Sequence, residues 1–144
     1  MQPTRADCIA LAVEAGAILR AGYNQPHQIK FKGIADLVTE IDARSEAFII
    51  QAIRERFPDH MIITEESGLL EGKASHCWFI DPLDGTTNYA HNLPIFAVSI
   101  GYMEDGVMKL AAVYDPMRDE CFSAELGQGA WLNGTRLQVA DTQD

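Results

Sequence analysis

The chain has 144 residues, a length that fits one domain with a usable hydrophobic core. Hydrophobic residues make up 47% of it, and no apolar run approaches the roughly 20 residues that a bilayer-spanning helix needs. The formal net charge of -10 argues against a nucleic acid or an anionic membrane as partner, because either would favour a basic surface.

Cysteine usage indicates the redox compartment. Cys8, Cys77 and Cys121 are odd in number, lack CxxC spacing and are flanked by apolar residues. These features predict reduced, buried thiols in a cytoplasmic protein, with neither a disulfide framework nor a zinc site. The N-terminal segment does not have the pattern of a signal peptide, because Asp7 and Glu14 interrupt its apolar residues.

Two helices are expected in the first part of the chain. In the first, apolar Ile9, Val13 and Ala17 recur at helical spacing, and Gly22 is the expected end. The second is expected over about residues 40–57, ending before Pro58. Its apolar stripe consists of Ile41, Phe48, Ile49, Ala52, Ile53 and Phe57.

After Pro58 the apolar period changes to that of strands, and Asp105-Gly106 gives a strong hairpin signal between two of them. Two helices followed by hairpin-connected strands predict an α+β fold, with both helices packed on an antiparallel sheet in a single domain over residues 1–144. The expected strands are Met61–Thr64, Cys77–Ile80, Ala97–Met103, Val107–Val113 and Glu120–Ala124.

The strongest chemical signal follows the strand at Cys77–Ile80. Asp81 comes at its end, and Asp84 follows three residues later through a turn that Pro82 stiffens. Such a loop can aim two carboxylates and the Leu83 carbonyl at one point, and this oxygen-only shell is what Mg²⁺ prefers. The sequence therefore predicts a magnesium site here.

The residues after Asp84 suit a phosphate group. Gly85 permits a positive φ or a close backbone approach, and the hydroxyls and backbone amides of Thr86 and Thr87 can receive phosphate oxygens at the start of a helix. The alternative is an ordinary Pro-Asx-Gly surface turn, which explains Asp84-Gly85 but leaves the rest of the segment as coincidence.

Two further acidic segments each have a structural alternative. Glu65-Glu66 ends the strand Met61–Thr64 and suits a metal ligand, although such a pair is more often solvated before a loop. Asp42 suits catalysis, although Thr39 followed by Asp42 also fits a helix N-cap with its capping-box acid. Catalysis and capping remain equally open on that segment.

These three segments, in this order and spacing, resemble the inositol monophosphatase family. The resemblance runs from about Lys32 to Val139, and its most specific part is the stretch DPLDGTTNYAHNLPIFAVSIGY, from Asp81 to Tyr102. The family has a layered αβαβα sugar-phosphatase fold, and the resemblance implies that this chain forms its N-terminal, metal-binding part. It also implies Mg²⁺ as cofactor, a small phosphate monoester as substrate, lithium sensitivity and a homodimer.

The resemblance implies a magnesium ligand set. Glu65, Asp81, the Leu83 carbonyl and Thr86 would surround a first ion. Asp81 and Asp84 would share a second ion. Asp81 would thus bridge two metals about 3.5–4 Å apart.

The resemblance also implies which residues hold the substrate and the attacking water. Gly85, Thr86 and Thr87 occupy the position that holds phosphate, beside the ligands Glu65, Leu83 and Asp84. Asp42 matches the acidic residue near Thr86 and the water, and Glu66 matches the second glutamate of the pair. The reaction implied is hydrolysis of a phosphate monoester by water, with inositol phosphate as the expected substrate and no covalent enzyme intermediate.

One part of the family pattern is missing. The family carries a Trp-Asp-x-Ala-Ala-Gly motif that completes the second metal site, whereas Trp78 and Trp131 here precede Phe79 and Leu132. The chain is therefore expected to be a fragment or a truncated form. An inactive fragment that binds a metal or a partner remains an alternative, as does a related sugar- or nucleotide-phosphate phosphatase.

A further alternative is a haloacid-dehalogenase-type phosphatase, in which a strand ends in DxDGT and the first aspartate attacks phosphorus. Two residues separate Asp81 from Asp84 instead of one, which would turn the second carboxylate away from its required position.

Overall fold

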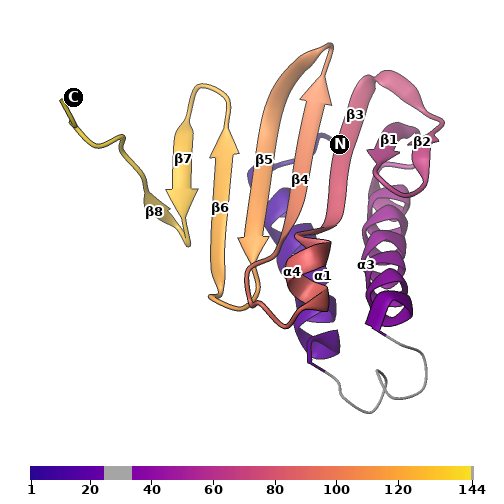
Figure 1. Ribbon diagram of the computed structural model, residues 1–144. Helices are drawn as coiled ribbons and strands as arrows, with labels where there is room; N and C mark the ends of the chain where they lie inside the picture. The colour runs from indigo at the N-terminus through magenta and orange to yellow at the C-terminus, as the bar shows by residue number, and fades with distance from the viewer. Residues whose placement is uncertain (25–33, 144) are drawn as a thin grey trace.

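A computed structural model describes residues 1–24 and 34–143 of the chain. Two long helices, a short helix and one mixed sheet make up these residues (Figure 1). The helices are α1 (Arg5–Gly22), α3 (Ile34–Arg56) and α4 (Thr86–Ala90). The strands are β1 (His60–Thr64), β2 (Gly68–Leu70), β3 (Lys73–Asp84), β4 (Ala97–Glu104), β5 (Val107–Asp115), β6 (Glu120–Glu125), β7 (Gly129–Leu132) and β8 (Thr135–Arg136).

The strands form one sheet in the order β2-β1-β3-β4-β5-β6-β7-β8. The predicted antiparallel sheet is confirmed for every neighbouring pair except β1 and β3, which run parallel. The parallel pair arises because the short strand β2 carries the chain back to the beginning of β1, where the Lys73 amide donates to the Asp59 carbonyl at 2.7 Å. β3 then starts again in the direction of β1.

Both long helices pack on the same face of the sheet, with α1 over β4–β6 and α3 over β1 and β3 (Figure 1). The predicted α+β arrangement of helices on a sheet is therefore confirmed. The strands turn alternate residues toward the helices, such as Val98 and Ile100 on β4. The predicted hairpin at Asp105-Gly106 joins β4 to β5, and both of its residues have positive φ.

The first helix ends at Gly22 as predicted, but its buried face differs from the expected one. Ala17 is exposed, while Cys8, Ala15 and Leu19 are fully buried. Apolar residues occupy most of this helix, so several of its faces have similar hydrophobicity. The face that is buried is the one that carries the large side chain of Leu19.

The second helix starts at Ile34, six residues before the expected start. Thr39 therefore lies inside the helix, and the N-cap alternative for this segment is wrong. Buried Leu37 and Val38 extend the stripe of Ile41 by one turn, and this packing outweighs the local capping signal.

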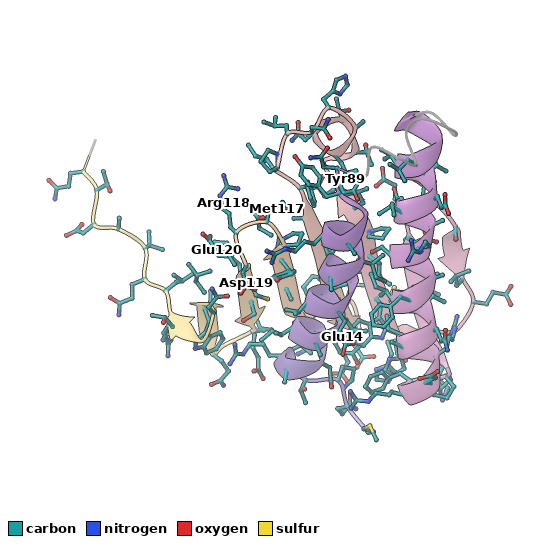
Figure 2. All side chains as sticks on the ribbon, turned by 90° about the horizontal axis from the view of Figure 1, so that it is seen from below. Glu14, Tyr89, Met117, Arg118, Asp119 and Glu120 are labelled. Atoms are coloured by element: carbon teal, nitrogen blue, oxygen red, sulfur yellow. The ribbon has the colours of Figure 1, made fainter. Side chains whose placement is uncertain are left out.

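The short helix α4 is held against the end of α1. Tyr89 points from α4 toward α1 (Figure 2). Its hydroxyl donates to the Leu19 carbonyl at 2.8 Å, and its ring packs edge-on against Tyr23 and Phe96. This anchor fixes the segment that follows Asp84. Among the described helices, none is both long enough and apolar enough to cross a membrane.

Candidate functional site

The parallel pair β1–β3 brings two predicted ligands together. Thr64 is the register partner of Ile80, so Glu65 and Asp81 follow side by side at the same end of the sheet. The repulsion between them is visible in the pKa of Asp81. Burial raises that pKa to about 6, with further contributions from the charges of Glu65 and Asp84.

The loop after Asp81 has the geometry that its glycine predicts. Gly85 has φ of 95° and ψ of 40°, and a Cβ atom there would lie 3.0 Å from the Ile95 carbonyl oxygen. The Leu83 side chain is buried, and its backbone amide hydrogen-bonds the Asp81 carboxylate. Asp84, at the end of β3, is exposed. The loop thus keeps Asp84 accessible while Asp81 is partly enclosed.

Asp42 joins this cluster from helix α3. Its side chain is 7% exposed. Burial raises the pKa of Asp42 to about 7, assisted by the negative charges of Glu66, Asp81, Glu46 and Glu65, in that order. The acidic residues singled out in the sequence, at Asp42, Glu65-Glu66 and Asp81–Asp84, therefore contribute to one electrostatic cluster.

A cavity of about 440 Å³ opens beside the cluster. Asp42 from α3, Glu66 from the β1–β2 turn and Thr86 from α4 all line it. Thr86 and Thr87 begin α4 as predicted and are exposed. The Thr87 carbonyl accepts hydrogen bonds from the His91 backbone amide and interacts with His91 Nδ1 at 2.8 Å, so His91 closes the end of α4.

The carboxylate oxygens of this cluster are ligands of the kind that a hard cation prefers. Three buried carboxylate oxygens have no hydrogen-bond partner among the residues that the structure describes: Asp42 Oδ1, Glu46 Oε2 and Asp81 Oδ1. Unpaired buried anions are costly, and a divalent cation would offset both their desolvation and their mutual repulsion. Within residues 1–24 and 34–143, however, no three Asp, Glu, His or Cys side chains already form a metal site. The oxygens fit Mg²⁺, but this part of the protein does not preassemble a complete shell.

The sequence interpretation missed two residues on α3. Ser45 donates to the Pro82 carbonyl at 2.9 Å and is fully buried, which ties the Asp81 loop to the helix. Glu46, placed outside the apolar stripe by its sequence position, is only 4% exposed. Their spacing from Asp42 could have predicted this, because residues three and four positions after Asp42 lie on the same face of a helix.

Two residues of the stretch that resembles the family are not fully described by the structure. Lys32, where the resemblance begins, lies outside the described residues. Asp36, four residues later, lies in α3, in a part whose side chains are not described.

Comparison with known proteins decides the family. The model of the inositol monophosphatase family matches residues 1–144. The chain belongs to this family. The fold and the order of its acidic segments agree with that membership, which argues against the haloacid-dehalogenase alternative.

The similar proteins include a curated relative and solved structures. Nus factor SuhB from Escherichia coli (strain K12) is 47% identical over 147 residues, covering 100% of this chain and 55% of that protein. The suhB protein of Bartonella henselae has a TM-score of 0.84 at 33% identity, covering 94% of this chain and 53% of that one. An inositol monophosphatase from Anabaena (Nostoc) sp. PCC 7120 has a TM-score of 0.79 at 41% identity, covering 94% and 48%. The chain therefore spans about half the length of the curated relatives that it matches.

Proposed function

We propose that this chain carries the magnesium- and phosphate-binding part of a phosphate monoester hydrolase of the inositol monophosphatase type. The observation that supports this most is the parallel pairing of β1 with β3, which places Glu65 beside Asp81. Asp84 follows in the same loop, and its charge acts on Asp81. Carboxylates converging from two strand ends form the kind of oxygen-rich site that phosphate-ester hydrolysis by metal-activated water requires.

Each residue has a defined task in this proposal. Asp81 would be shared between two ion positions, one completed by Glu65 and the Leu83 carbonyl and the other by Asp84. Magnesium bound there would lower the pKa of a bound water and neutralise the oxygen of the leaving alcohol. The backbone amides and hydroxyls of Thr86 and Thr87 would hold the phosphate oxygens.

Asp42 and Thr86 would orient the attacking water. Both line the same cavity, so a water bound there can contact the Asp42 carboxylate and the Thr86 hydroxyl. Glu66 lines that cavity as well and would hold the water from the β1–β2 turn. Gly85 lets the chain turn so that Thr86 reaches this position.

The proposed substrate is an inositol phosphate, by similarity to the Anabaena enzyme, which is named an inositol monophosphatase. A related sugar phosphate or nucleotide phosphate is the alternative. A cytoplasmic homodimer is the assembly we expect for the complete protein.

A second candidate function is partner binding without catalysis by this chain. The Escherichia coli relative is named a Nus factor, and one face of the sheet here exposes apolar side chains such as Val113 and Phe122. This candidate predicts no phosphate release by the chain alone, together with binding through that face.

A phosphate-release assay separates these candidates. Inositol phosphate, a sugar phosphate and a nucleoside monophosphate would each be tested with Mg²⁺ and with EDTA. The chain would be assayed alone and joined to the part of Escherichia coli SuhB that it does not match. We expect Mg²⁺-dependent release at least from the joined protein, and hydrolysis that persists in EDTA would contradict the metal mechanism.

The variant Asp81→Asn gives the sharpest test of the metal bridge. In the joined protein it should reduce turnover by about 100-fold or more, because it removes a shared negative ligand. Asp141→Asn, in the C-terminal tail, is the matched control and should leave turnover unchanged. Near-normal turnover of Asp81→Asn would remove the bridging role.

A further inference from the structure

Glu46 is a buried carboxylate to which the proposed mechanism gives no task. It lies on α3, one helical turn after Asp42, and lines the same cavity as Glu66. Its Oε1 atom accepts hydrogen bonds from the Thr64 hydroxyl at 3.0 Å and from the Ser67 hydroxyl. Its Oε2 atom is buried and has no hydrogen-bond partner within the described part of the chain. The two hydrogen bonds to Oε1 offset part of the desolvation of this enclosed carboxylate.

The two partners of Glu46 bracket the paired glutamates. Thr64 is the last residue of β1, and Ser67 immediately precedes β2. The Ser67 backbone amide also donates to the Thr64 hydroxyl oxygen at 2.9 Å. Three hydrogen bonds thus close a ring through Glu46, Thr64 and Ser67. The turn that carries Glu65 and Glu66 is tied to α3 at both of its ends by one carboxylate.

The turn lies at the exposed edge of the sheet. Residues 65–69 are exposed, and among the described strands β2 is the edge strand, paired with β1. Without a tether, such a segment belongs to the parts of a protein that open locally at low free-energy cost. Each time a metal bound, ordering a metal-binding residue on such a segment would then cost conformational entropy.

We propose that Glu46 is a positioning residue whose carboxylate anchors the β1–β2 turn to α3 and so holds Glu65 beside Asp81. The consequence for metal binding rests on the proposed function, whereas the anchoring itself does not. Glu46 acts through Thr64 and Ser67 and touches no reacting atom in this proposal.

Hydrogen exchange of this chain, measured by mass spectrometry without metal, tests the anchor. In Glu46→Ala the amides of residues 65–68 should exchange about 10-fold faster or more, while those of β4 and β5 keep their rates. Glu46→Gln retains an acceptor oxygen and should restore most of the protection. The matched control Glu55→Ala, an exposed glutamate near the end of the same helix, should leave the turn unchanged.

Two outcomes would overturn the anchor. One is unchanged exchange of residues 65–68 in Glu46→Ala, and the other is equal acceleration in every strand, which would mean that Glu46 stabilises the fold as a whole. Should Glu46→Ala fail to fold, Ser67→Ala removes one of the two hydroxyl donors from the exposed turn and should accelerate the same amides to a smaller extent. Unchanged exchange of residues 65–68 in Ser67→Ala would then overturn the proposed anchor.

Calorimetric titration of the same variants with MgCl₂ tests the consequence. Glu46→Ala should weaken Mg²⁺ binding by about 10- to 100-fold, the range found when residues that orient metal ligands are removed, while Glu46→Gln stays close to the parent. Equal affinities of Glu46→Ala and the parent would overturn the positioning role. If the parent itself takes up no Mg²⁺, the proposed function fails for this chain, and the exchange measurement still decides whether Glu46 anchors the turn.

Discussion

At Asp42, burial and four neighbouring carboxylates all act in the same direction on the pKa. An acid whose pKa is raised by folding keeps a proton in the folded state that it has lost in the unfolded state. Its contribution therefore lowers the free energy of unfolding as the pH rises from the ordinary value of 3.8 to about 7, with no further loss above that pH. In the metal-free protein, Asp42 is thus a source of instability at neutral and alkaline pH.

We expect Asp42→Asn to stabilise the metal-free chain at pH 8 by about 2 kcal/mol, because the amide cannot acquire the buried charge. At pH 4.5, where Asp42 is protonated in the folded state, the two proteins should differ by less than about 0.5 kcal/mol. Urea unfolding at both pH values, in EDTA, measures this. A difference that is the same at both pH values would show that charge is not the cause.

Individual residues differed in how far the sequence could predict them. Asp81 and Asp84 were predictable because a buried strand, a proline and a glycine define their loop locally. Glu46 was not, because its burial depends on Thr64 and Ser67, which lie about 20 residues away in the sequence. A glutamate beside an apolar stripe has the same local pattern whether it is solvated or enclosed.

Among the elements, the helices and hairpins were predictable and the parallel strand pair was not. The hairpin turn at Asp105-Gly106 is encoded by two adjacent residues. The β1–β3 pairing instead depends on β2, a strand of three residues whose pattern is too short to recognise. That pairing is also what brings Glu65 to Asp81, so the convergence of the ligands could be proposed from the family resemblance but not from the local pattern.

The glycine that precedes α4 allows a prediction about how this element contributes to stability. Gly85→Ala should destabilise the chain by about 2–3 kcal/mol, because the new Cβ meets both a positive φ and the Ile95 carbonyl. The matched control is Gly106→Ala, where φ is also positive but nothing lies within 4 Å, and it should cost only about 1 kcal/mol. Thermal unfolding of both variants checks the difference, and equal losses would mean that the contact with Ile95 is unimportant.

For the molecule as a whole, the two faces of the sheet are unequal. One face is covered by α1 and α3 (Figure 1). On the other face, β5 and β6 expose the apolar side chains of Val113 and Phe122. Val113 and Phe122 are register partners on that second face and are 40% and 42% exposed. A contiguous apolar surface of this kind favours association with another protein or with a second copy.

We expect the isolated chain to self-associate through this face, and Phe122→Lys to weaken that association by about 10-fold because it buries a charge at the contact. Leu69→Lys, at the opposite edge of the sheet, is the matched control and should have no effect. Sedimentation velocity over a range of concentrations measures both. A parent chain that stays monomeric throughout, or equal effects of the two substitutions, would contradict the prediction.

The parallel register of β1 and β3 also limits how the length of the chain can change during evolution. A residue inserted at Glu71, between β2 and β3, lies outside the paired segments Met61–Thr64 and Cys77–Ile80, and the register already shifts between His60 and Met61. One residue added within Cys77–Ile80 would instead turn Asp81 to the opposite side of its strand. Homologues that keep the chemistry should therefore vary in length between β2 and β3 and remain constant in length along the end of β3.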